Sequence, residues 1–84
     1  MIDRSVSKVT TEKLSAKELF AINVRHYRDM RGYTQAQLAN IIEFSRFRVS
    51  EVERGRFATN LDIVQRFADA LNIDVWRLFM DPMD

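Results

Sequence analysis

The residues with the clearest chemical potential form a short run after Ser45, namely Arg46, Phe47 and Arg48, with Glu51 three residues further on. Ser45 is a favoured helix N-cap residue, so a helix is expected to begin with this run. The first turn of that helix would present two cations and a bulky aromatic group outward. Phe47 would then face away from the core, which raises the question of what it contacts.

Other kinds of site chemistry have little support in this chain. It has no cysteine and a single histidine among 84 residues, so thiol chemistry is excluded and no metal site is expected. No nucleophile–base pair, phosphate-binding loop or pair of catalytic acids is recognisable. We therefore expect no enzymatic activity and no cofactor. The lack of cysteine fits a reducing cytoplasm, and no apolar run approaches the ~20 residues of a membrane span.

The net charge of +1 conceals an uneven distribution of charge. Residues 1–57 carry 11 Lys/Arg and 7 Asp/Glu, a net charge of +4, whereas residues 58–84 carry 2 and 5, a net charge of −3. This division suggests one side that faces a polyanion and an acidic opposite side. The chain is 46% apolar and 30% charged, which is typical of one small globular domain.

The hydrophobic pattern predicts an all-α fold, a compact five-helix bundle. We expect a flexible arm over residues 1–14 and the folded domain over residues 15–84. The predicted helices span residues 16–31, 35–42, 46–54, 61–71 and 75–80, and their N-caps are Ser15, Thr34, Ser45, Asn60 and Asp74. The residues expected to face inward on the first four helices are Phe20, Val24, Tyr27, Leu38, Ala39, Ile42, Val49, Val52, Leu61, Val64, Phe67, Ala68 and Leu71.

Two short helices joined by a tight turn describe a helix-turn-helix, and the residues make this interpretation more specific. The segment TQAQLANIIEFSRFRVSEVERG, residues 34–55, resembles the Cro/CI-type helix-turn-helix of phage repressors, the Xre family. The matching positions are Thr34, Gln35, Leu38, Ala39, Ser45, Val49, Ser50, Glu53 and Gly55. The segment FADALNIDVWRLF, residues 67–79, resembles the closing pattern of the same family. The resemblance covers about residues 18–80 and implies a lambda-repressor-like DNA-binding domain.

Two positions depart from the family pattern. The family often has glycine in the interhelical turn, where this chain has Glu43, and proline before the next helix, where this chain has Thr59. A non-glycine residue in the left-handed conformation costs about 1 kcal/mol, so the turn at Glu43 could be reshaped. Neither change falls on the face that the family uses to bind DNA.

Arg28 and Glu53 are predicted to form a structural ion pair. Arg28 follows Val24 by four residues and Glu53 follows Val49 by four, so both charges fall on or beside the inward stripes of their helices. A charge left alone there would be costly. The family resemblance implies the same arginine–glutamate link between the first and third predicted helices. The alternative is a pair of solvated charges at the edge of the core.

The resemblance places the start of the third predicted helix in the major groove of DNA. It implies base contacts for Arg46, Phe47, Arg48 and Glu51, by the known preferences of arginine for guanine, phenylalanine for a thymine methyl group and glutamate for cytosine. A base edge would thus be the partner of Phe47. The alternatives are that Arg48 reaches only a phosphate and that Phe47 folds back onto the preceding helix. Phosphate contacts are predicted for Gln35, Arg54 and Arg56.

Trp76, Phe79 and Met80 are predicted to form a dimer interface, because Trp76 stands where the family usually has a polar residue. The alternative is a tryptophan that covers its own helix. The sequence thus predicts a homodimeric transcriptional regulator that binds a palindromic operator in double-stranded DNA, similar to a phage repressor or a restriction–modification controller. The alternatives are an antitoxin that binds DNA and a toxin, and a protein-interaction module that has lost DNA binding.

Overall fold

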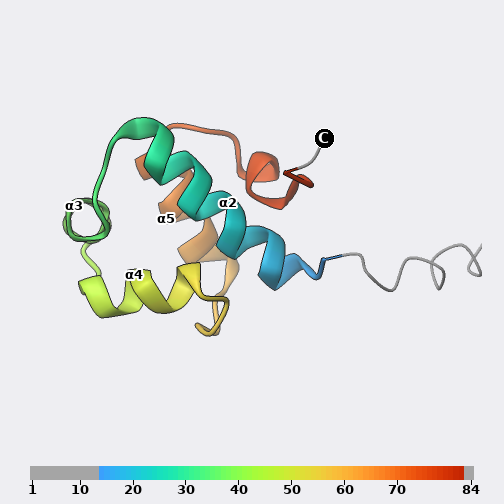
Figure 1. Cartoon of the computed structure of the whole chain (residues 1–84), viewed down its shortest axis with the longest axis horizontal. Helices are drawn as coiled ribbons and strands as arrows, with labels where there is room; N and C mark the ends of the chain where they lie inside the picture. Colours follow the sequence, from blue (N-terminus) through green and yellow to red (C-terminus); the bar gives the residue numbers. More distant parts are fainter. Residues whose placement is uncertain (1–13, 83–84) are drawn as a thin grey trace, which may run out of the picture.

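The described part of the chain, residues 14–82 of a computed structural model, folds into four α-helices and one 3₁₀ helix (Figure 1). The α-helices are α2 (Ala16–Arg31), α3 (Gln35–Ile42), α4 (Arg46–Glu53) and α5 (Leu61–Leu71), and the 3₁₀ helix is η1 (Val75–Phe79). The predicted all-α class is confirmed, with no strand among the described residues. The predicted arm lies outside the described residues except for its last residue, Leu14.

Each α-helix begins directly after the cap residue that the sequence predicted. Ser15 and Thr34 open α2 and α3 with complete capping boxes, in which the cap and the third helical residue satisfy each other's backbone N–H groups. The side chains of Ser45 and Asn60 accept a hydrogen bond from the backbone N–H three residues further on. Four short local signals therefore set the start of every α-helix in the described residues.

The turns after α2, α3 and α5 each place a residue in the left-handed conformation. Gly32 (φ 76°) and Asn72 (φ 58°) do so as expected. Glu43 does the same, with φ 62° and ψ 41°, and its backbone N–H donates to the carbonyl of Asn40. The interhelical turn therefore keeps a glycine-like geometry without glycine, at a strain of about 1 kcal/mol.

The prediction of a fifth α-helix was wrong. Val75–Phe79 forms a 3₁₀ helix, in which the backbone N–H of Arg77 donates to the carbonyl of Asp74 at 3.0 Å. Asp74 provides no side-chain cap. η1 has only five residues, and such short pieces often close with the tighter i to i+3 bonds. The described bundle therefore has four α-helices, not five.

The core lies where α2, α3, α4, α5 and η1 meet. Leu61 was wrongly predicted to belong to it, since this side chain is 81% exposed. Side chains lean toward the N-terminus of their helix, so the first residue of α5 points past the packed layer. Tyr27 is only partly buried. The remaining predicted core residues are buried, and they are Phe20, Val24, Leu38, Ala39, Ile42, Val49, Val52, Val64, Phe67, Ala68 and Leu71.

Packing around α2 organises the molecule. In Figure 1, α2 crosses the view diagonally, α4 runs along the lower edge and α3 is seen end-on, and α2 contacts α4, α5 and η1. Arg31 and Arg66 connect neighbouring helices by donating to the C-terminal carbonyls of Leu71 (2.8 Å) and Ile42 (3.0 Å). No helix among the described residues is long and apolar enough to cross a membrane.

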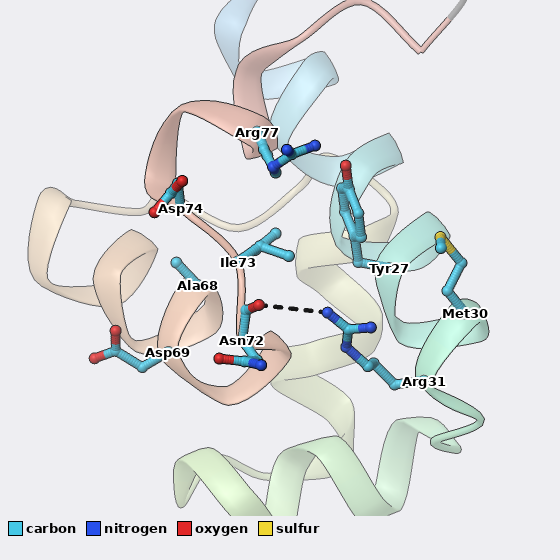
Figure 2. Close-up of a pocket in the computed structure, with 9 residues that line it drawn as sticks. All are labelled: Tyr27, Met30, Arg31, Ala68, Asp69, Asn72, Ile73, Asp74 and Arg77. Carbon is cyan, nitrogen blue, oxygen red and sulfur yellow. Dashed lines mark hydrogen bonds between the residues drawn. The ribbon is translucent and has the colours of Figure 1, made fainter.

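A mixed-charge groove of about 480 Å³ opens beside Arg31, between the C-terminal half of α2 and the segment that joins α5 to η1 (Figure 2). Arg31 and Arg77 line it together with Asp69 and Asp74. Figure 2 shows Arg31 reaching the carbonyl oxygen of Asn72, so part of its positive charge is used to hold the end of α5.

Candidate nucleic-acid interface

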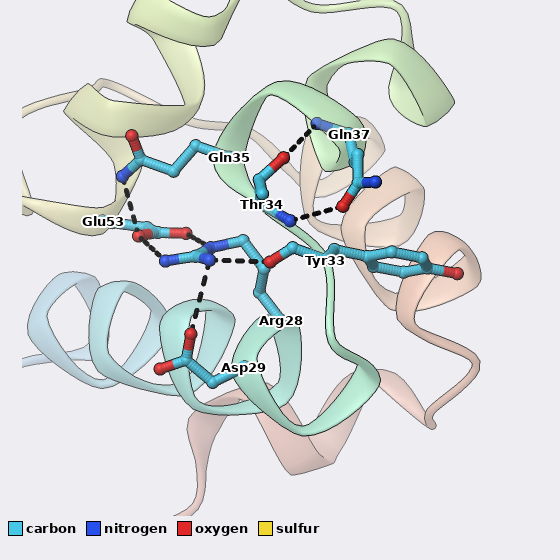
Figure 3. Close-up of polar contacts among 7 residues, drawn as sticks. All are labelled: Arg28, Asp29, Tyr33, Thr34, Gln35, Gln37 and Glu53. Carbon is cyan, nitrogen blue, oxygen red and sulfur yellow. Dashed lines mark hydrogen bonds and ion pairs between the residues drawn. The ribbon is translucent and has the colours of Figure 1, made fainter.

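Arg28 and Glu53 join α2 to α4 through two hydrogen bonds (Figure 3). Nε of Arg28 lies 2.6 Å from Oε2 of Glu53, and Nη2 lies 3.0 Å from Oε1. The side chains are 11% and 4% exposed. The hydrogen bond to Glu53 is the main cause that raises the pKa of Arg28, burial lowers it, and the charges of Glu53 and Asp29 raise it further. This bidentate pair fixes the spacing of the two helices.

The same network positions the start of α3. Nη1 of Arg28 donates to the carbonyl of Tyr33 at 2.8 Å, and Nε2 of Gln35 donates to Oε1 of Glu53 at 3.0 Å. Figure 3 shows the side chains of Arg28, from α2, and Gln35, from α3, meeting at Glu53 of α4. Gln35 was predicted to contact a phosphate. One N–H of its side-chain amide donates to Glu53, and the second remains available to an external acceptor.

A groove of about 490 Å³ lies over this network, between α2, the start of α3 and the outer face of α4. Phe47 is 70% exposed at its edge. Two lining residues, Arg25 and Ser50, were not predicted as site residues, although each lies three residues from a predicted one, Arg28 or Phe47. The groove is lined by Arg25, Arg28, Gln35, Arg46, Phe47, Ser50, Glu51, Glu53 and Arg54.

The groove has a surplus of positive charge. Glu53 neutralises Arg28, and Glu51 lies 3.8 Å from Arg54. In the described part of the chain, Arg25 and Arg46 have no acidic partner within ion-pair distance. Such a surface attracts a polyanion.

Two predicted DNA contacts lie outside this groove. Cζ of Arg48 lies 4.0 Å from the ring centroid of Phe44 and 5.2 Å from that of Phe57, on another flank of α4. Arg56 is exposed just after α4, and its backbone N–H donates to the carbonyl of Glu51. The structure therefore groups Arg46, Phe47 and Glu51 but separates Arg48 from them.

The three residues predicted to form a dimer interface differ in exposure. Trp76 is 55% exposed and Met80 is 37% exposed. Phe79 is partly buried, and its ring stacks on Phe20 with centroids 5.9 Å apart. Trp76 and Met80 thus offer apolar surface, while Phe79 packs against the core of its own chain.

Comparison with known proteins gives the class. The family model for helix-turn-helix proteins, HTH_3, matches residues 24–75. Because this match covers more than half of the chain, the protein belongs to the helix-turn-helix family, which is a family of DNA-binding regulators. The predicted resemblance to Cro/CI-type, Xre-family regulators is confirmed.

Three relatives show the range of the similarity. The chain is 31% identical over 68 residues to a hypothetical transcription factor of Neisseria meningitidis, and the match covers 81% of this chain and 64% of that protein, just under two thirds of its length. The control protein C.SmaI of Serratia marcescens is 37% identical over 65 residues, with 77% of each chain covered. The structure of the restriction–modification controller C.AhdI of Aeromonas hydrophila superposes with a TM-score of 0.70 at 32% identity, covering 74% of this chain and 94% of that one.

Proposed function

We propose that this protein is a sequence-specific transcriptional regulator that binds a palindromic operator in double-stranded DNA as a homodimer. The observation that carries the proposal is the groove over α4, where Arg46 and the 70% exposed ring of Phe47 lie beside unpaired positive charge. If a base edge covers this ring in the complex, the removal of its apolar surface from water favours binding. Family membership and the similarity to controller proteins support the same reading.

Three side chains in the groove are proposed to read bases. Arg46 can bind guanine with its fork of N–H groups, Phe47 can cover a thymine methyl group, and Glu51 can accept from cytosine N4. Glu51 shares its carboxylate with Arg54 at 3.8 Å, a long contact that leaves acceptor capacity for a base. These contacts would supply the sequence preference.

Three other residues are proposed to contact phosphates and to position the protein. Gln35 lies at the N-terminus of α3, where free backbone N–H groups favour an anion, and its amide is oriented by Glu53. Arg54 and Arg56 follow α4 and are exposed. These residues would set affinity and register without choosing a sequence.

The homodimer is proposed on the exposed apolar surface of Trp76 and Met80, with Phe79 supporting it from within the chain. A two-fold dimer uses the same patch on both subunits, and a palindromic operator has the matching symmetry.

The proposal is tested by selecting binding sites from a random DNA pool with the wild type and with Arg46→Ala, Phe47→Ala and Arg56→Ala. Arg46→Ala should lose about 1–3 kcal/mol of binding free energy and relax the base preference at one base pair per half-site. Phe47→Ala should weaken the preference for a thymine with little change in salt dependence, because no charge is removed. Arg56→Ala should weaken binding to all sequences alike and lower the slope of affinity against salt concentration by about one unit per half-site.

The control is Lys17→Gln, which removes an exposed charge at the start of α2, away from the groove. This variant should keep the wild-type consensus and nearly the wild-type affinity. Wild-type consensus and full affinity in both Arg46→Ala and Phe47→Ala would mean that α4 does not read DNA. The alternative hypothesis, a protein-interaction module that has lost DNA binding, would then be the better one.

A further inference from the structure

The side chain of Arg48 lies on an aromatic platform that is anchored in the core. Its guanidinium carbon is 4.0 Å from the ring centroid of Phe44 and 5.2 Å from that of Phe57. Phe44 comes from the α3–α4 turn and Phe57 from the segment between α4 and α5. Phe44 also packs edge-on against the fully buried Phe67, with centroids 5.7 Å apart. The platform is therefore a rigid support rather than a loose surface contact.

Stacking occupies the face of a guanidinium and leaves its edge free. The N–H donors of arginine lie in the plane of the group, so a ring beneath the plane blocks none of them. Within the described residues, the guanidinium of Arg48 has no ion-pair partner and donates no hydrogen bond to another residue. Arg48 is exposed, so these guanidinium N–H donors, which have no partner among the described residues, fit an anion with acceptor oxygens.

Other positive charge gathers at the same platform. Cζ of Arg66 lies 5.7 Å from the ring centroid of Phe44, so this ring has two cations near it. Glu43 and Asp69 line a shallow groove with Arg66, and Arg48 is not among the residues that line it. The positive charge of Arg48 is thus left for an external partner.

The position of Arg48 on α4 decides which part of DNA it can meet. Two residues correspond to about 200° of rotation on an α-helix, so Arg48 leaves α4 on nearly the opposite flank from Arg46. Arg48 is also absent from the groove that Phe47 and Glu51 line. A helix that enters the major groove with its outer face has phosphates along both flanks. To reach a base, Arg48 would have to leave both rings.

We propose that Arg48 binds a backbone phosphate of the DNA, as an arginine fork held ready by Phe44 and Phe57, and does not read a base. The proposal rests on the proposed function, because it assumes that α4 faces DNA. Stacking fixes the side chain before binding, which reduces the conformational entropy lost when the phosphate is bound. Arg48 then sets the position of α4 in the major groove, while Arg46 and Phe47 set the sequence preference.

The test compares Arg48→Gln with wild type on the selected operator and on non-specific DNA across a salt series. Arg48→Gln should weaken both complexes by the same factor and lower the salt slope by about 0.9 per half-site, while the selected consensus stays unchanged. Phe57→Leu keeps the charge and removes one ring of the platform. It should weaken binding and keep the wild-type salt slope. Melting temperatures show whether each variant is folded.

A second measurement places the contact directly. Operators carrying one neutral methylphosphonate at a time should reveal a phosphate whose neutralisation weakens wild type but not Arg48→Gln. Phe57→Leu, which keeps the charge of Arg48, should lose affinity at that phosphate as wild type does. A consensus changed at one base pair in Arg48→Gln would make Arg48 a base reader, and unchanged affinity and slope would make it purely structural. Wild-type protein that binds no DNA would instead overturn the proposed function.

Discussion

At the residue scale, sequence spacing predicted the contacts of charged residues that lie four positions after an inward-facing residue of their helix. Arg28 and Glu53 were predicted as a pair from their four-residue offsets, and the structure places them 2.6 Å apart. The environment of Arg48 was not predictable, because the rings of Phe44 and Phe57 come from two separate loops. Helical periodicity orders side chains around one helix, but it does not say which loop folds over them.

The pair of Arg28 and Glu53 gives a stability prediction at this scale. Arg28→Ala should cost about 3–5 kcal/mol of unfolding free energy, because it leaves the 4% exposed carboxylate of Glu53 without its partner. Glu53→Ala should cost about as much, and the double variant less than the sum of the two. The measurement is denaturant unfolding of all three. Near-wild-type stability in each of them would show that the pair is not structural.

The pH dependence of this contribution follows from the pKa of Arg28. Its pKa is raised in the folded state, so the stabilisation is fully present below the pKa of the unfolded chain. It is lost only as the pH rises through the folded value. We therefore expect the difference in stability between wild type and Arg28→Gln to stay constant from pH 6 to pH 9, as measured by urea unfolding.

At the element scale, the four α-helices could be predicted because the residues that signal the start of each one lie within a few positions of each other. Capping boxes at Ser15 and Thr34 are examples. The type of η1 could not be predicted, because the hydrophobic pattern of five residues fits an α-helix and a 3₁₀ helix equally well. What holds η1 in place was also missed. Asn23 is 3% exposed and donates to the carbonyls of Leu78 (3.1 Å) and Met80 (2.8 Å).

Asn23 therefore gives a prediction about this element. Asn23→Ala leaves the two carbonyls without their side-chain donor, and it should cost about 1–3 kcal/mol of unfolding free energy. Hydrogen exchange of residues 75–80 should speed up more than exchange in α3. The control is Ile22→Ala, at a neighbouring side chain that is 40% exposed. If the two variants lose the same stability and exchange alike, the amide of Asn23 does not fasten η1.

At the scale of the whole molecule, the structure shows where the unevenly distributed charges of the sequence lie. The positive surplus includes Arg25 and Arg46 in the groove over α4, whereas Asp62, Asp69 and Asp74 are exposed on α5 and the segment that follows it. A molecule charged in this way is expected to approach DNA with α4 first. Assembly is harder to predict from one chain, because an exposed tryptophan indicates an interaction surface but does not identify what binds to it.

Trp76 carries the prediction about assembly. Trp76→Glu replaces a 55% exposed apolar side chain by a charge, so it should leave the melting temperature of the monomer nearly unchanged. If two subunits meet through this surface, the variant should sediment as a monomer where wild type is a dimer, and its operator affinity should fall with the same concentration dependence. Footprinting of wild type should show two protected half-sites ~34 Å apart, and the variant should lose both together. Ile41→Glu changes another exposed side chain (47%) on α3 and should remain dimeric. A Trp76→Glu protein that still sediments as a dimer at low concentration would place the interface on another face of the molecule.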